Sequence, residues 1–310
     1  MSQRWPNLEV EITHIHTTGD RVTSVPLTQI GGDGVFVTEI ERALREGRID
    51  LAVHSLKDLP TATPADLHIV VPGPREDVRD LLVAHDNIPI VRDYSQQGVS
   101  TAQTQPSWRI GTCSLRRSAQ IRALYPSAQI VPIRGNVDTR LRKLEAGEYD
   151  AIILASAGLH RLQLQAGLVD CLTYFPLDMM MPAPGQGALA LECRNEAALR
   201  DLLEPLRDMA VQAATCAERM FMRELGAGCY LPVGAYGEII DDALTLRGLV
   251  ISLDGQRCIR VNERIPWTPG STLAQAEQLG VRLAEQALAQ GADRIIHELT
   301  AAQEQEGQHV

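Results

Sequence analysis

The feature that most constrains the fold is a pattern that occurs twice, one hundred residues apart. In Leu44–Asp50 and again in Leu144–Asp150, a helical stretch ends at a glycine, and an apolar run begins after the aspartate. Glycine commonly follows the last residue of a helix because it adopts positive φ at no steric cost. Strands that alternate with helices favour a mostly parallel sheet with helices on its faces. We therefore expect two similarly built α/β domains; the alternative is two independent instances of a common connection.

Periodicity predicts the elements around these two turns. Strands are expected at Leu8–Ile15, Ile49–His54, Arg109–Cys113, Gln129–Ile133, Tyr149–Ala155 and Ala188–Cys193. Helices are expected over Gly34–Glu46, after Ser114 as a cap, and from Asn136 to about Ala146. Arg92–Ser107, rich in Ser, Gln and Thr, is predicted to be an exposed loop.

From about Arg207 the pattern changes to that of a third, α+β domain. A helix is predicted at Cys216–Leu225 and a long one at Thr272–Ala289, and strands at Val233–Ile239, Leu244–Ser252 and Gln256–Asn262. The polar tail after Thr300 is expected to be frayed.

Charge and cysteine usage narrow the function classes. A net charge of −10 argues against a nucleic-acid-binding protein, which needs a basic face. The longest apolar run, near Ala151–Leu159, is of strand length, well short of the roughly 18 residues that a membrane span needs. The N-terminus has no apolar signal-peptide core. The six cysteines are scattered with no C-x-x-C pair, which disfavours a zinc site or a disulfide framework and indicates a cytoplasmic protein with reduced thiols.

One segment of this acidic chain is basic. Residues 109–143 contain eight Lys and Arg residues and one acidic residue, Asp138. Arg122, Arg142 and Lys143 suit a solvated helix face. Arg116, Arg117 and Arg134 follow predicted strands, and the carboxyl ends of strands are where open α/β sheets bind ligands. Because the arginine fork binds carboxylate or phosphate in a bidentate manner, we expect an anion site. The absence of a Walker-type glycine run disfavours phosphate transfer.

Two further features carry chemistry less specifically. Lys57 and Asp58 follow a predicted strand and precede Pro60, where Asp58 could stabilise a developing cation. Taken alone, these residues are better explained by an ordinary turn with Asp58 as a helix cap. Cys229 lies in a glycine-rich turn, and Cys113 lies near a helix N-terminus and two arginines. Either thiol could be a nucleophile, and composition alone does not decide between them.

Taken together, the motifs resemble the porphobilinogen deaminase family, also called hydroxymethylbilane synthase. The resemblance runs from about Leu8 to Gly237 and continues more weakly to the C-terminus. The motifs that carry it are Thr17–Arg21, Asp50–Pro60, Gly111–Arg117, Arg134–Arg140, Ala183–Ala188 and Glu218–Pro232 around Cys229.

The resemblance implies three domains, the first two built like periplasmic solute-binding proteins. It places domain 1 at residues 1–86 and 186–205, domain 2 at 87–185, and domain 3, a smaller α+β unit, at 206–310. It implies a monomer that binds neither nucleic acid nor membrane. It also implies a transferase that deaminates four porphobilinogen molecules and joins them into hydroxymethylbilane on a covalent dipyrromethane primer.

The site residues follow from the same resemblance. Cys229 matches the cysteine that holds the dipyrromethane cofactor through a thioether, and Asp58 matches the catalytic aspartate. The cofactor carboxylates are expected on Lys57, Ser114, Arg116, Arg117, Arg134 and Arg140, and the substrate on Arg161, Ser55 and His54.

The chain also departs from the family pattern. The 92–107 loop is longer than usual, and Asp33 stands where Lys is usual. The opening strand and most of the first helix are absent, so we expect that Met1 is an internal methionine and that the 310-residue form folds poorly and is inactive. The alternatives to an active enzyme are a truncated inactive relative and a non-catalytic small-anion binding protein.

Overall fold

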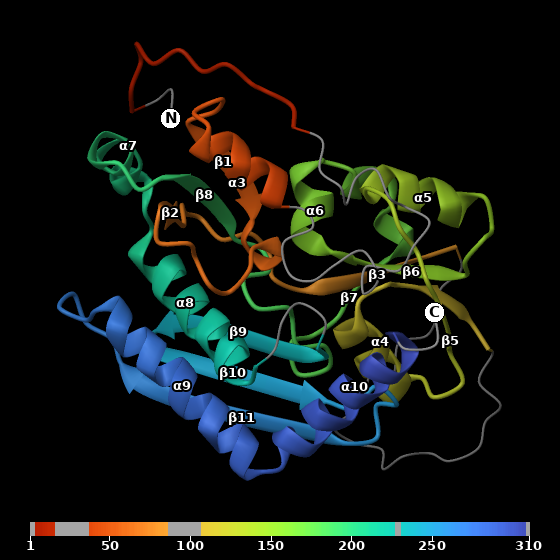
Figure 1. Ribbon diagram of the computed structural model, residues 1–310. Helices are drawn as coiled ribbons and strands as arrows, with labels where there is room; N and C mark the ends of the chain where they lie inside the picture. Colours follow the sequence, from red (N-terminus) through yellow and green to blue (C-terminus); the bar gives the residue numbers. More distant parts are fainter. Residues whose placement is uncertain (1–3, 16–36, 86–106, 227–230, 308–310) are drawn as a thin grey trace.

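The computed structural model describes residues 4–15, 37–85, 107–226 and 231–307, which form three sheets and the helices that cover them (Figure 1). Asp33, Cys229 and all but the last residue of the predicted 92–107 loop lie outside the described residues. In the part of the chain that is described, no helix is long and apolar enough to cross a membrane.

The largest sheet has five strands in the order β5-β4-β6-β3-β7. These are β5 (Gln129–Val131), β4 (Arg109–Gly111), β6 (Ala151–Ala155), β3 (Asp80–Ala84) and β7 (Leu172–Tyr174). Strand β4 runs parallel to β5 and β6, whereas β3 runs antiparallel to both β6 and β7. The sheet is therefore mixed, and the expectation of a mostly parallel sheet was wrong in its β3–β7 half.

Helices cover both faces of this sheet. Helix α4 (Leu115–Leu124) packs on one face through Ile121, against Ile110 and Ile153. Helices α5 (Val137–Glu145) and α6 (Ser156–Arg161) pack on the other face, against Ile152 and Leu154. Because successive residues of β6 face opposite layers that are both buried, its sequence is apolar throughout rather than alternating.

The second sheet has the order β1-β8-β2, and both of its pairings are antiparallel. It consists of β1 (Leu51–Ser55), β8 (Leu189–Arg194) and β2 (Leu67–Val70), with helices α3 (Thr38–Arg45) and α7 (Ala197–Leu203) beside it. The prediction of a mostly parallel sheet was wrong here, because strand β8 enters from a distant part of the chain and lies between β1 and β2.

The predicted strand at Leu8–Ile15 is not formed. Its alternation of apolar and polar residues suits a strand, but no described residue pairs with it, and Val10 and Ile12 are 61% and 79% exposed. An alternating segment becomes a strand only where a neighbour accepts its backbone hydrogen bonds and covers its apolar face.

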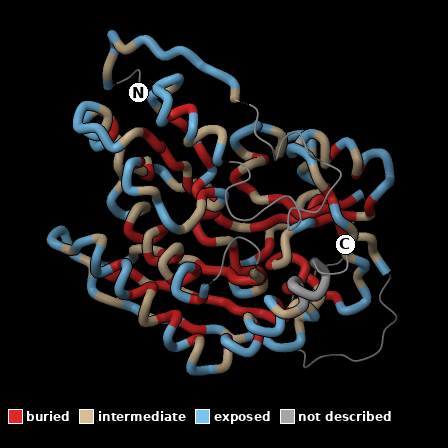
Figure 2. Tube along the Cα trace, in the orientation of Figure 1, coloured by how far each residue is buried: buried red, intermediate tan, exposed pale blue. Residues whose placement is uncertain are grey.

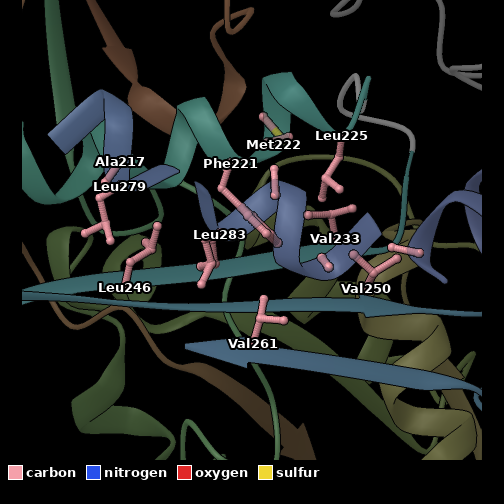
Figure 3. Close-up of a cluster of buried hydrophobic side chains, with 14 of the residues drawn as sticks. Ala217, Phe221, Met222, Leu225, Val233, Leu246, Val250, Val261, Leu279 and Leu283 are labelled. Atoms are coloured by element: carbon pink, nitrogen blue, oxygen red, sulfur yellow. The ribbon is translucent and has the colours of Figure 1, made fainter. Parts of the chain in front are cut away.

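The third sheet is an antiparallel meander in the order β11-β10-β9. Its strands are β9 (Val233–Ile240), β10 (Ala243–Ile251) and β11 (Cys258–Pro266), and its helices are α8 (Met209–Glu224), α9 (Leu273–Ala289) and α10 (Ala292–Gly307). Figure 3 shows Phe221, Leu246 and Leu283 meeting between α8, α9 and the sheet in the core of this unit. The expectation of a frayed tail after Thr300 was wrong, because α10 continues to Gly307.

Short 3-10 turns complete the fold at Leu56–Asp58, Gln165–Gly167, Val169–Cys171 and Glu204–Leu206. Two segments connect the first two sheets, one from β2 to β3 (71–79) and one from β7 to β8 (175–188). Burial follows the strands and the helix sides that face them (Figure 2). The candidate site lies where these two connecting segments meet the strand ends.

Candidate active site

The turn after β1 presents Lys57 and Asp58. Leu56 and Leu59 are each 1% exposed and pack against Ala188, while Asp58 is exposed and Lys57 is half-buried. The Leu56 amide donates to the Ala188 carbonyl (3.0 Å), and the Leu59 amide closes the turn on the Leu56 carbonyl (3.2 Å). Gly185 lies so close to this turn that a Cβ atom on it would be 3.2 Å from the backbone nitrogen of Lys57. The φ of +76° at Gly185 also favours glycine. Two buried leucines therefore anchor the turn and leave its two charged residues at the junction of the sheets.

Arg116 and Arg117 converge on a carboxylate that is fully buried, that of Asp80. Arg116 Nη1 lies 2.7 Å from Asp80 Oδ2, and Arg117 Nη2 lies 2.7 Å from Asp80 Oδ1. Burial alone would raise the pKa of Asp80, but the two guanidinium groups outweigh it and hold the pKa well below its usual range. Both arginines are buried, which excludes a solvated helix face for them.

The mixed topology explains why these groups meet. Ser114 caps α4 by accepting from the Arg117 amide (3.4 Å), so both arginines lie in the first turn of a helix that follows the carboxyl end of β4. Strand β3 runs antiparallel to β6, so its first residue, Asp80, lies opposite Ala155 at the carboxyl end of β6. A parallel β3 would have placed Asp80 at the other edge.

Gln186 connects this buried cluster to the turn after β1. Its side-chain nitrogen donates to Asp80 Oδ1 (3.0 Å) and to the Val78 carbonyl (2.8 Å), and its Oε1 accepts from Lys57 Nζ (3.4 Å). Burial, followed by the charges of Arg117 and Arg116, lowers the pKa of Lys57 to about 8, although Asp58 and Asp80 act in the opposite direction.

Arg140 extends the cluster from helix α5, which packs on the opposite face of the five-stranded sheet from α4. Burial and then the charge of Arg117 lower its pKa, while Cys113 and Asp58 act to raise it. Its Nε donates to the Gly135 carbonyl (2.7 Å). These mutual electrostatic effects group Lys57, Asp58, Arg116, Arg117 and Arg140, which the sequence separates by up to 83 positions.

The remaining predicted residues lie around this group or apart from it. Arg134 is half-buried at the start of the turn before α5, and Arg161, exposed at the end of α6, donates to the Gly187 carbonyl (2.8 Å). Ser55 is exposed at the end of β1. His54 is buried, with Nε2 3.0 Å from Glu192 Oε2 on β8, so its described contact is with the protein itself. Cys113 is exposed, and Cys229 lies outside the described residues.

The charges of the group do not balance. Among the described residues, four cations, Lys57, Arg116, Arg117 and Arg140, lie around two carboxylates, those of Asp58 and Asp80. An excess of partly buried positive charge is costly unless an anion compensates it. The residues therefore fit a ligand that carries several carboxylates, as a dipyrromethane with acetate and propionate side chains does. Fold and site together define an α/β protein with a cluster of cations suited to a polyanion where two sheets meet, beside a turn with an accessible carboxylate.

The comparisons with known proteins specify this class. Residues 1–200 match the family model "Porphobilinogen deaminase, dipyromethane cofactor binding domain", and residues 213–289 match "Porphobilinogen deaminase, C-terminal domain". The chain belongs to the porphobilinogen deaminase family, and its first 200 residues are that family's cofactor-binding region.

Individual relatives agree over most of the chain. The porphobilinogen deaminase of Syntrophotalea carbinolica is 44% identical over 94% of this chain and 86% of its own length. That of Syntrophobacter fumaroxidans is 42% identical over 97% and 92%. Among solved structures, an ancestral cationic amino acid solute binding protein covers 55% of this chain, and the chain covers 68% of it, with 15% identity and a TM-score of 0.32. A similarity of that size says nothing about what this chain binds.

Inspection of the sequence missed two residues of the site. Asp80 was not singled out, although it is an acid at the start of an apolar run, Asp80–Ala84, which itself went unpredicted as a strand. Gln186 was noted only within a motif, since an amide side chain has no recognisable signature of its own. The sequence does contain a signal for Asp80. This acid follows a charged segment, Arg75–Arg79, and directly precedes a strand-length apolar run.

Proposed function

We propose that this chain catalyses the head-to-tail condensation of four porphobilinogen molecules into hydroxymethylbilane, with the release of ammonia, in tetrapyrrole biosynthesis. The observation that carries the proposal is the cation excess of Lys57, Arg116, Arg117 and Arg140 around the Asp58 turn, in a chain of this family. Each pyrrole of substrate and product carries two carboxylates, so a growing chain requires many cations around it.

The roles of the residues follow from charge and position. Lys57, Ser114, Arg116, Arg117, Arg134 and Arg140 hold the carboxylates of a dipyrromethane bound through the Cys229 thioether, and Arg161 and Ser55 contact the substrate. His54, which is buried against Glu192, is left out of this set. When bound, this cofactor supplies the pyrrole carbon to which the first substrate is joined. Arg117, whose three nitrogens already donate to Asp80 and to the Ile153 carbonyl, contributes mainly charge, whereas Arg116 has only Nη1 engaged in the hydrogen bonds described.

Asp58 carries the chemistry of the proposal. Positive charge develops on the substrate as its C–N bond breaks and ammonia leaves. A fixed carboxylate within reach of the pyrrole N–H stabilises that charge more than it stabilises the neutral ground state, and this difference lowers the barrier. Asp58 is exposed at the end of an anchored turn, as this role requires.

We further propose that the three sheets correspond to three domains with the predicted boundaries, 1–86 with 186–205, 87–185 and 206–310. The position of β8 between β1 and β2 supports the discontinuous first domain. We also propose a cytoplasmic monomer that binds no nucleic acid. The net charge of −10 supports the last point, and the five described cysteines, all free thiols, support a reducing compartment.

A turnover assay tests the proposal. Purified protein is incubated with porphobilinogen, and substrate loss, ammonia release and product mass are followed. We expect one ammonia per porphobilinogen consumed and one linear tetrapyrrole per four. The proposal replaces the expectation that the 310-residue form is inactive, and its support is the first sheet, β1-β8-β2, which is formed. A non-catalytic anion-binding protein would bind porphobilinogen without consuming it, and a truncated inactive relative would show no turnover, so either result would refute the proposal.

A further inference from the structure

The turn that carries Asp58 is held from outside its own sheet by one arginine of helix α8. Arg219 Nη1 donates to the carbonyls of Leu59 (3.1 Å) and Leu56 (3.4 Å), and Nη2 donates to the Pro60 carbonyl (2.5 Å). The last carbonyls of a helical turn have no partner within the turn and require an external donor. A single planar guanidinium group thus supplies donors at the end of the Leu56–Asp58 turn.

The residue before Arg219 fixes the position of α8. Glu218 is fully buried, with Oε1 2.7 Å from Arg75 Nη1 and Oε2 accepting from the Gly185 amide (2.6 Å). Oε1 also accepts from the Gly237 amide of β9 (2.7 Å). Arg75 and Gly185 belong to the two segments that connect the first two sheets. Helix α8 is therefore attached to both connections at the point from which Arg219 reaches the turn.

Further contacts repeat this attachment at the start of α8. The Asp208 amide donates to the Val71 carbonyl (3.0 Å), and the Val71 amide donates to Gln212 Oε1 (3.2 Å). A Cβ atom on Gly73 would lie 2.2 Å from Asp208 Oδ2, so the helix and the connecting segment leave no room for a side chain between them. Because α8 cannot shift without breaking these contacts, the backbone from which the Arg219 side chain extends is held in position.

We propose that Arg219 is a positioning residue for Asp58, and that through it the helix leading to Cys229 fixes the turn that carries the carboxylate. The hydrogen bonds of Arg219 to the turn go to backbone carbonyls, so the proposed role is exerted through the turn and not on the reacting atoms. The role rests on the proposed function for its catalytic meaning, but the hold on the turn can be measured without turnover.

The experiment compares Arg219→Met with Arg223→Met, one helical turn further along α8, where the side chain is exposed and has no side-chain hydrogen bond among the described residues. The comparison uses protein whose intact mass shows that the cofactor adduct is retained. We expect Arg219→Met to lower kcat by about 10- to 100-fold with little change in KM, because small displacements of a catalytic group cost this much. Arg223→Met should behave as the unaltered protein. Normal kcat in Arg219→Met, or equal losses in both variants, would overturn the proposal.

A double variant separates positioning from general destabilisation. If Arg219 acts through Asp58, then adding Arg219→Met to Asp58→Asn lowers kcat no further, because the carboxylate that it positions is already gone. Multiplied losses would mean that Arg219 acts elsewhere, and would refute the role.

Hydrogen exchange at the Leu59 amide keeps the proposal testable apart from turnover. We expect faster exchange at this amide in Arg219→Lys, which keeps a cation but loses the fork, and unchanged exchange in the Arg223→Met control. Arg219→Lys also serves if Arg219→Met does not fold. Unchanged exchange in Arg219→Lys would refute the hold on the turn. Absence of turnover in the unaltered protein would refute the proposed function, and the exchange result would stand on its own.

Discussion

At the scale of single residues, Asp58 is the side chain on which the proposed chemistry depends most. Asp58→Asn keeps the shape and removes the charge. Loss of one well-placed electrostatic stabiliser costs about 3–4 kcal/mol of barrier, so kcat should fall about 10²- to 10³-fold with little change in KM. Steady-state kinetics checks this, with Asp170→Asn, an exposed acid in the 169–171 turn, as the control. Near-normal kcat in folded Asp58→Asn would contradict the role.

Arg116 should bind a carboxylate of the ligand in addition to its ion pair with Asp80. Arg116→Leu is expected to lose the cofactor adduct or to stall chain elongation, because it removes charge and one partner of Asp80. Intact-protein mass and single-turnover product analysis measure both effects. Arg122 is a poor control because its Nη1 donates to the Leu253 carbonyl (2.7 Å), so the expectation of a solvated Arg122 was wrong.

Arg142 is the better control for this experiment. It is exposed on α5 and bonds only within its own helix among the described contacts, so Arg142→Leu should shift stability by less than about 0.5 kcal/mol and leave adduct and turnover unchanged. Equal losses in Arg116→Leu and Arg142→Leu would refute a special role for Arg116.

Lys57 predicts a pH dependence of binding. Its pKa in the folded protein is about 8, so its positive charge is present below that pH and is lost as the pH rises through it. Carboxylate binding should weaken over this range, and the KM for porphobilinogen should rise above about pH 8. In Lys57→Arg the cation persists and this rise should disappear. KM profiles from pH 7 to 10 decide the matter, and identical profiles would exclude Lys57 as the cause.

At the scale of elements, the antiparallel strand β3 determines where the site forms, because it brings Asp80 to the arginines. Asp80→Asn leaves two buried cations against a neutral amide. Breaking a buried ion pair by removing one partner costs about 3–5 kcal/mol, which denaturant unfolding would measure. The control is Asp77→Asn, whose carboxylate pairs with half-exposed Arg79 and should cost about 1 kcal/mol or less.

The same carboxylate predicts acid sensitivity. Because the pKa of Asp80 is lower in the folded than in the unfolded chain, its contribution is complete above the unfolded value and is lost as the pH falls below it. Stability below about pH 4 should therefore fall more steeply in the unaltered protein than in Asp80→Asn. Parallel pH profiles would contradict this account of the cluster.

Local signals in the sequence predicted the positions of helices and strands better than they predicted which strands pair. Helices α4 and α5 begin after Ser114 and Asn136, as expected, because the start of a helix depends largely on neighbouring residues. The Ser114 side chain caps α4, whereas the Asn136 side chain makes no capping hydrogen bond. Strand direction and partners depend on distant segments, so the antiparallel pairings of β3 and β8 were not predicted, and the predicted Leu8–Ile15 strand is not formed. In the same way, the basic segment indicated an anion site, but that Arg116 and Arg117 share one buried acid was visible only in three dimensions.

At the scale of the whole molecule, α8 links the three sheets. It packs on β9 and α9 in the third unit, and its Glu218 and Arg219 reach the two connecting segments and the Asp58 turn (Figure 1). Four residues separate the end of this helix, Glu224, from Cys229 in the sequence. A cofactor attached at Cys229 would be tethered close in sequence to the helix that also contacts the Asp58 turn and the junction of the first two sheets.

Intact-protein mass shows directly whether Cys229 carries the cofactor. We expect the purified 310-residue protein to be heavier than its sequence by one covalently attached dipyrromethane. The added mass should be lost in Cys229→Ser and kept in Cys113→Ser. Unaltered protein at the bare sequence mass, or an adduct that persists in Cys229→Ser, would contradict this expectation.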